Sequence, residues 1–126
     1  MLHLIEPLAF DMDDTKLKRA GLDYHDLAHV RVHPDLDDLL AELNGRIWAF
    51  TGKTKNLYSD IAYADGDCLL FGSEPDGLPD WVMEHPRVTG LVRIQMVPER
   101  RSLNLANAAS IATYEAWRQL GYPGGE

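Results

Sequence analysis

The sequence has too little cysteine for a disulfide-bonded protein and no apolar run long enough for a membrane-spanning helix. Cys68 is the single cysteine among 126 residues, which excludes an internal disulfide and makes the cytoplasm the expected location. No apolar run approaches the roughly 20 residues that cross a bilayer, so no membrane partner is expected. The first ten residues, MLHLIEPLAF, also lack the basic segment and the small-residue cleavage site of a signal peptide.

Positive charge is also scarce. Lysine and arginine together number 12 against 20 acidic residues, which gives a formal net charge of −8. This charge argues against a protein that coats nucleic acid through a global positive field. Each local cluster of basic residues is most simply a solvated surface, yet a local basic patch stays possible. The clusters are Lys16/Lys18/Arg19, Lys53/Lys55 and Arg100/Arg101.

What the sequence does contain is an alternation of strand-like and helix-like segments. The composition, 45% hydrophobic, fits a single domain over residues 1–126. The alternation predicts an α/β fold in which helices cover both faces of a sheet. The expected strands are 2–7, 29–33, 46–51, 67–72 and 91–96. The expected helices are 13–21, 34–45 (capped by Asp35 and ended by Asn44-Gly45), 78–85 and 103–120.

Three of the expected strands are followed at once by small or polar residues. Ligands of open α/β sheets bind outside the carboxyl ends of the strands. The candidate site is therefore the set of loops that begin at Thr51, Gly72 and Val97. Gly72 in particular follows a buried strand directly, where a missing Cβ lets a ligand approach the backbone.

Other kinds of site are poorly supported. FTGKTK would be a phosphate loop only with a glycine five positions before Gly52, where Ile47 stands. A nucleophilic serine or cysteine would need a neighbouring base, and Cys68 sits in an apolar strand. His25, His29 and His33 are spaced by four, but Val30-Arg31-Val32 between them predicts a strand, which breaks a shared helical face. No metal site is expected, because no cysteine or carboxylate completes a tetrahedral set.

The segment RRSLNLANAAS, residues 100–110, places two asparagines three apart at the start of an apolar helix. Asparagine is a poor helix former because its amide competes for backbone groups. Capping by Ser102 or Asn104 explains one polar residue at a helix start. It explains Asn107 poorly, because Asn107 lies one turn further in. The segment therefore indicates a binding or catalytic role beside the cap.

Two stretches together resemble a known family. FGSEPDGLP and RIQMVPERRSLNLANAASIATYEAWRQLGY resemble the second and third motifs of the SPOUT class of RNA 2′-O-ribose methyltransferases, F-G-x-E-x-x-G-L-P, I-P-M and S-L-N-L-S-N-A. The front segment, LHLIEPLAFDMDDTKLKRAGLDYHDL, resembles the branch of small, single-domain enzymes that methylate the wobble nucleotide (cytidine or uridine) of tRNA.

The resemblance implies a fold, a chemistry and an assembly. The fold would be an α/β domain whose C-terminal part forms a trefoil knot, and the knot would bind S-adenosylmethionine. The enzyme would transfer a methyl group to a ribose 2′-hydroxyl of tRNA in the cytoplasm. It would be a homodimer packed through the knot and the C-terminal helix, with Tyr114 and Trp117 at the interface.

The resemblance also assigns roles to residues by position. The implied catalytic residues are Asn104 and Asn107. The implied cofactor contacts are Phe50, Gly72, Glu74, Ile94, Ser102 and Leu103. Arg100, Arg101 and Lys53 would contact RNA, mainly through its phosphates.

This sequence departs from the family pattern at four places. Gln95 replaces the proline of I-P-M, Ala106 replaces a serine, and Asp76 stands where a basic residue is common. Family members also begin with a further strand and helix that carry an N-T-G-N motif and an arginine, whereas the resemblance here starts at the family's second strand. Two functions therefore stay open, a methyltransferase and a non-catalytic dimer that binds S-adenosylmethionine or RNA.

Overall fold

The structure is a computed structural model that describes residues 2–5, 30–73, 77–96 and 104–125. The chain forms two compact units, Met1–Asn44 and Gly45–Glu126. The expected helix at 13–21, with its cluster of basic residues, lies outside the described residues. None of the described helices is long and apolar enough to cross a membrane.

The first unit pairs two short strands and covers them with one helix. β1 (Leu2–Ile5) and β2 (Val30–His33) are parallel, with Leu2 opposite Val30 and Ile5 opposite His33. α3 (Leu36–Glu42) contacts both strands. The predicted cap is confirmed, because Oδ1 of Asp35 accepts a hydrogen bond from the Asp38 N–H at 2.8 Å.

The end of α3 differs from the prediction. The sequence predicts that Asn44-Gly45 stops the helix, but α3 ends at Glu42 and Leu43 is already extended. Gly45 serves another purpose. A Cβ at Gly45 would lie 2.0 Å from the carbonyl oxygen of Gly66, so the missing side chain lets two backbone segments meet.

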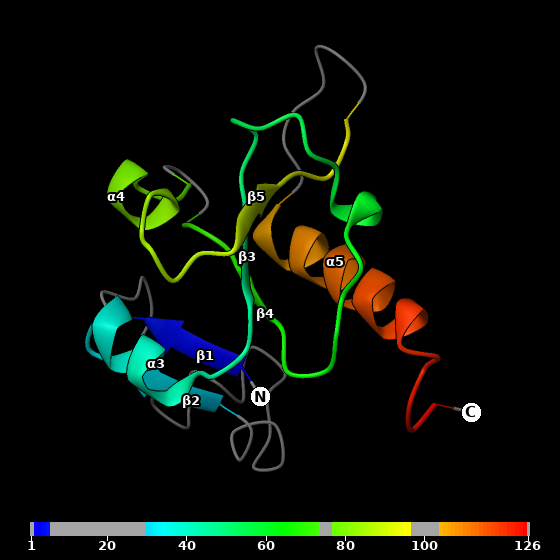
Figure 1. Ribbon diagram of the computed structural model, residues 1–126, viewed down its shortest axis with the longest axis horizontal. Helices are drawn as coiled ribbons and strands as arrows, with labels where there is room; N and C mark the ends of the chain where they lie inside the picture. Colours follow the sequence, from blue (N-terminus) through cyan, green and yellow to red (C-terminus); the bar gives the residue numbers. More distant parts are fainter. Residues whose placement is uncertain (1, 6–29, 74–76, 97–103, 126) are drawn as a thin grey trace. The chain divides into compact units, whose positions relative to one another are not determined.

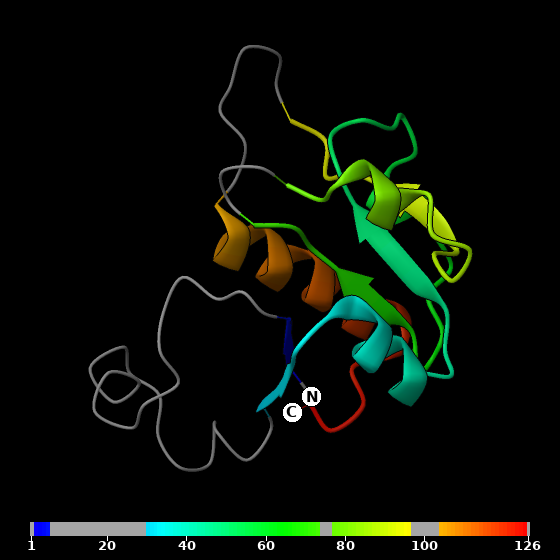
Figure 2. The same ribbon diagram turned by 90° about the vertical axis from the view of Figure 1, so that its left-hand side faces the viewer.

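The second unit is built on a three-stranded parallel sheet. β3 (Ile47–Phe50) lies in the centre, between β4 (Cys68–Leu70) and β5 (Gly90–Val92). Figures 1 and 2 show α4 (Asp80–Met83) on one face of this sheet and α5 (Leu105–Gln119) on the other. The predicted α/β sheet with helices on both faces is confirmed for this unit.

A small aromatic core lies under α5. Trp48, Tyr63 and Val92 form its buried centre, and the half-buried Ala116 of α5 packs against them. The Tyr63 hydroxyl donates to the Tyr58 carbonyl at 2.6 Å, next to the short 3-10 helix η1 (Tyr58–Asp60). Burial raises the pKa of Tyr63 to about 12, so this tyrosine stays neutral and can keep donating.

The carboxylate of Asp67 accepts hydrogen bonds from several segments near the start of β3 and β4. Asp67 accepts from Arg46 at 2.8 Å, from the Trp48 indole N–H at 3.0 Å and from the Ala64 N–H at 3.0 Å. Its side chain is only 7% exposed. Burial alone would raise the pKa of this carboxyl, but the three hydrogen bonds together hold it below its usual range.

We expect Asp67→Asn to lower the free energy of unfolding by about 1–3 kcal/mol, because a neutral amide cannot accept from all three donors. The lowered pKa means that the ionised form stabilises the fold above about pH 4 and that this stabilisation is lost as the pH falls further. Urea unfolding across a pH series tests this, with the exposed Asp65→Asn as the control. If the difference in free energy of unfolding between wild type and Asp67→Asn did not become smaller at acid pH, ionised Asp67 would not be the stabilising group.

Candidate functional site

The carboxyl ends of the three parallel strands of the second unit meet at one edge of the sheet. Phe50 ends β3 and lies opposite Val92 of β5, while Gly72 follows β4 by two residues. The loop after β3 joins the same edge, because the Thr51 N–H donates to the Val92 carbonyl at 2.9 Å. Ile94 follows β5 by two residues, so Phe50, Gly72 and Ile94, three of the predicted cofactor contacts, all lie at or just after the strand ends at this edge.

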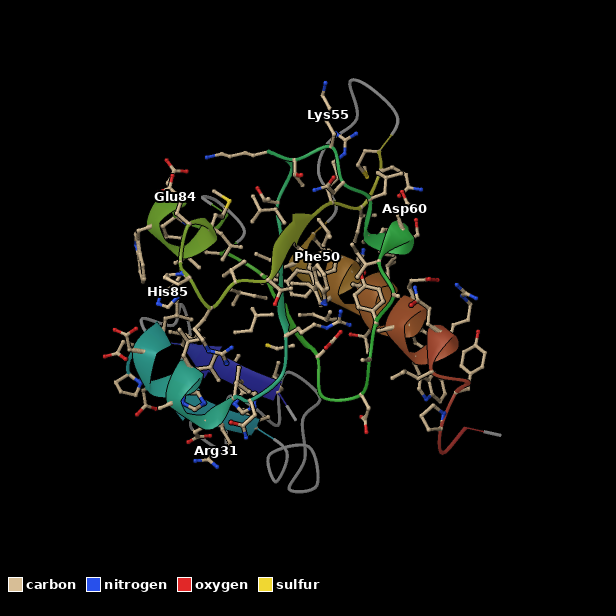
Figure 3. All side chains as sticks on the ribbon, viewed as in Figure 1. Arg31, Phe50, Lys55, Asp60, Glu84 and His85 are labelled. Carbon is tan, nitrogen blue, oxygen red and sulfur yellow. The ribbon has the colours of Figure 1, made fainter. Side chains whose placement is uncertain are left out.

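Two aromatic rings lie stacked at this edge. The rings of Phe50 and Phe71 are 4.5 Å apart between centroids and 22° from parallel, and both residues are half-buried. Figure 3 labels Phe50 beside the ends of the central strands. Phe71 is not among the residues predicted from the sequence. Its signal was present, since it is the first residue of the FGSE motif.

Gly72 has a reason to be glycine that the sequence analysis did not identify. A Cβ there would lie 2.1 Å from the carbonyl carbon of Gly77 and 2.2 Å from the backbone nitrogen of Leu78. The turn closes through a 2.8 Å hydrogen bond from the Gly77 N–H to the Ser73 carbonyl. Gly77 itself has φ +67°, which favours glycine. The motif thus folds back on its own backbone. Glu74 lies outside the described residues.

The start of α5 settles which residue caps the helix. Oδ1 of Asn104 accepts from the Asn107 N–H at 2.8 Å, so Asn104, not Ser102, is the N-cap. Asn107 lies exposed on the first turn. Figures 1 and 2 show α5 running antiparallel to the strands and beginning near the edge where they end. Ser102 and Leu103 lie outside the described residues.

The basic residues assigned to RNA differ in what the structure describes. Lys53 is exposed and its Nζ lies 3.2 Å from Oδ1 of Asp80, at the start of α4. An exposed ion pair of this kind contributes little to stability and is easily exchanged for another partner. Lys55, labelled in Figure 3, projects from the same loop. Arg100 and Arg101 lie outside the described residues.

Arg93 is a further residue that sequence reasoning missed. It follows β5 directly. Its N–H donates to the Asn56 carbonyl, and its carbonyl accepts from the N–H of Tyr58 at the start of η1, both at 2.9 Å. Its Nε is buried and has no hydrogen-bond partner within the part of the chain that the structure describes. A buried guanidinium donor without a partner favours an anionic or carbonyl acceptor nearby. Arg93 opens the quoted stretch RIQMVPERR, but the family pattern I-P-M begins one residue later and assigns the arginine no role.

These features define an α/β protein whose candidate site lies at the carboxyl ends of three parallel strands. The chain belongs to the SpoU rRNA Methylase family, whose pattern matches residues 1–114. The tRNA (cytidine(34)-2′-O)-methyltransferase of Escherichia coli strain K12 is 49% identical over 124 residues, which cover 98% of this chain and 79% of that relative.

Solved structures agree with this assignment. One, from a study of the 2-OH methylation of C/U34 on tRNA, has a TM-score of 0.84 at 42% identity and covers 95% of this chain and 78% of its own. A SpoU methyltransferase from Streptomyces viridochromogenes, solved in complex with the cofactor AdoMet, has a TM-score of 0.78 at 21% identity. It covers 96% of this chain and 50% of its own, and this likeness shows the fold alone.

We expect Gly72→Ala to destabilise the second unit by about 1–3 kcal/mol or more, because backbone atoms must move to admit the methyl group. Gly52→Ala is the matched control, since a Cβ at this exposed glycine meets nothing within 4 Å. Thermal unfolding of both variants measures the difference. Equal melting temperatures would show that the turn at Gly77 is not held as described.

Proposed function

We propose that this chain transfers a methyl group from S-adenosylmethionine to a ribose 2′-hydroxyl of tRNA, at the anticodon wobble position. One observation carries the proposal: 49% identity, over 98% of the chain, to a relative named for this reaction on cytidine 34 of tRNA. The site supports it, because the described residues of the family motifs gather at one edge of a parallel sheet. The domain would be a single SPOUT domain with a C-terminal trefoil knot.

The described residues fit S-adenosylmethionine as the cofactor. The stacked Phe50 and Phe71 offer an apolar, half-buried surface that suits an adenine ring. The buried Nε of Arg93, which bonds to none of the described residues, suits a carboxylate or a hydroxyl oxygen. Gly72 and Ile94 would contribute backbone groups, and the proposed contacts of Glu74, Ser102 and Leu103 complete the set. When bound, the cofactor supplies a methyl group that its sulfonium charge already activates.

The protein must then orient a weak nucleophile. A ribose hydroxyl reacts only when it is aligned with the methyl group and can lose its proton. Asn107 presents an exposed side-chain amide on the first turn of α5, which suits orientation of the hydroxyl or the cofactor. Asn104 acts through the helix instead, because its amide oxygen is committed to the cap. Asn104 is therefore proposed as a positioning residue for Asn107.

Binding of tRNA would rely on local charge. The net charge of −8 opposes any global attraction to RNA, so a few basic side chains must meet the phosphates. Lys53 is available for this because its exposed pair with Asp80 is weak. Arg100 and Arg101 would act with it. Such contacts would position the tRNA, while the recognition of position 34 would need contacts to bases.

We also propose a cytoplasmic homodimer packed through the knot and α5. Several large apolar side chains of α5 are exposed, which is costly for a helix that remains in water. Tyr114 is the most exposed at 63% and lies beside Trp117, with 5.6 Å between ring centroids. The others are Leu105 and Ile111, together with Leu120 at the C-cap of the helix.

The function is tested by transfer of a labelled methyl group to bulk tRNA, followed by mapping of the modified nucleotide. We expect Asn107→Ala to lose at least about 100-fold in rate, the effect of removing one group that orients or stabilises the reacting atoms. Asn104→Ser is the matched control: it keeps a capping oxygen but no amide, and it should retain most of the activity.

Asn104→Ala should lose the cap, about 1 kcal/mol of stability, and part of the activity. Calorimetry with S-adenosylhomocysteine shows whether each variant still binds the cofactor product. Full activity in Asn107→Ala would refute its role. Wild-type protein that binds S-adenosylhomocysteine but methylates no tRNA would favour the non-catalytic dimer instead.

The dimer is tested by sedimentation of Tyr114→Glu. We expect this variant to sediment as a monomer, because a buried unpaired carboxylate in an apolar interface is strongly unfavourable. Trp81→Glu is the matched control, since Trp81 is 60% exposed and lies on α4, across the sheet. A wild-type chain that sediments as a monomer, or a Tyr114→Glu chain that stays dimeric, would contradict the proposed interface.

A further inference from the structure

Two histidines from different strands of the first unit lie with their ring nitrogens together. Nδ1 of His3 on β1 is 3.0 Å from Nε2 of His33 on β2. The register places Ile5, not His3, opposite His33. Residues two apart on a strand share a face, so His3 and Ile5 point to the same side of the pair of strands as His33. The two rings thus converge from 30 residues apart in sequence.

The second nitrogen of His33 has a partner that fixes the ring. Nδ1 of His33 lies 2.7 Å from Oδ2 of Asp38, on the first turn of α3, and His33 is only 1% exposed. An ionised carboxylate can only accept, so Nδ1 carries the proton. The Nε2 atom of a neutral His33 is then an acceptor that faces His3. Histidines that bind metals in proteins are commonly oriented by a carboxylate in this way.

The carboxylate of Glu42 lies beside the two histidines and forms a group of three possible metal ligands with them. Glu42 lies four residues after Asp38, so both side chains project from one face of α3. The ligand atoms of His3, His33 and Glu42 all lie within 4.8 Å of one another. Oε1 of Glu42 also accepts from Nη2 of Arg31 at 2.8 Å (Arg31 is labelled in Figure 3). One such bond leaves most of the acceptor capacity of the carboxylate free.

We propose that His3, His33 and Glu42 bind a divalent transition-metal ion of the zinc class, which links β1, β2 and α3 of the first unit. Two imidazoles and a carboxylate are zinc ligands, and a fourth position would be left for water. Two zinc–nitrogen bonds at a tetrahedral angle span about 3.3 Å, so the observed 3.0 Å needs only a small adjustment. Asp38 and Arg31 are positioning residues for this site.

Charge around the cluster favours a cation over a simple hydrogen bond between the histidines. Among the described side chains at the cluster, Asp38 and Glu42 carry two negative charges and Arg31 one positive charge, so with neutral histidines these side chains together are net negative. A shared proton would satisfy His3 and His33 but would make no use of Glu42. A divalent ion would use all three ligands and offset the excess negative charge.

The sequence predicts no metal site, because a strand breaks the spacing of His25, His29 and His33 and no cysteine or carboxylate completes a tetrahedral set with them. His25 and His29 lie outside the described residues, and His33 lies on a strand as predicted. The partners of His33 come from far along the chain, and no local pattern marks them.

The test uses the full chain, stripped of metal with a chelator and titrated with zinc by calorimetry. We expect one zinc per chain, a rise in melting temperature, and with cobalt the intense visible absorption of a tetrahedral site. His33 is buried, so the variants are His3→Gln and Glu42→Gln, each of which should weaken binding at least about tenfold. His85→Gln, a histidine of the second unit, is the matched control and should bind as wild type does.

Circular dichroism of each metal-free variant confirms that it still folds. Absence of zinc binding by wild type at millimolar zinc would overturn the proposal. So would His3→Gln and Glu42→Gln variants that fold and bind zinc as tightly as wild type. None of these measurements depends on methyl transfer, so the metal site and the proposed function can fail independently.

Discussion

The parallel pairing of β3 with a strand on each side is the constraint on which the second unit depends. Ile47 to Ala49 pair with β4, and Trp48 to Phe50 pair with β5. Because all three strands run the same way, their carboxyl ends meet at one edge. Functional residues that follow any of the strands therefore lie at that edge. Ala49 and Val92 are fully buried at the centre of this sheet. The site therefore lies on a rigid platform rather than on one independent loop.

The opposite ends of the same strands are held by polar contacts. Asp67 gathers Arg46, Trp48 and Ala64, while Gln119 of α5 accepts from the Tyr63 N–H at 2.9 Å and donates to the Ile61 carbonyl at 2.9 Å. These bonds anchor the C-terminal end of α5 to the segment between β3 and β4. Since a helix of this length is stiff, an anchored far end also fixes where its first turn lies. The position of Asn107 thus depends on contacts at the other end of its helix.

Local signals in the sequence predict most of the described elements and the edge of the sheet where the candidate site lies. Caps, alternation and turn residues predict most of the described strands and helices, but the strand expected at 91–96 is observed as Gly90–Val92 and η1 is not predicted. The strand ends predict loops that begin at Thr51, Gly72 and Val97, whereas Phe50 and Ile94 are implied by the family resemblance. What local patterns could not predict is chemistry that depends on long-range contact. Gly45 looked like a helix stop but serves a backbone contact at Gly66. His33 likewise gains its partner His3 only through strand pairing.

The composition of α5 is compatible with both roles proposed for it, which are to place Asn107 near the strand ends and to pack in the dimer interface. Ala112 is fully buried and Ala116 packs on the aromatic core, so small side chains let the helix lie close to the sheet. Large apolar residues on that face would hold the helix away and displace its first turn from the strand ends. The large side chains of the helix, such as Ile111 and Tyr114, lie on its exposed side instead. A second copy of the chain that covered this side of α5 would hold the helix against the sheet of the first copy. Dimerisation and the placement of Asn107 would then be coupled through one rigid element.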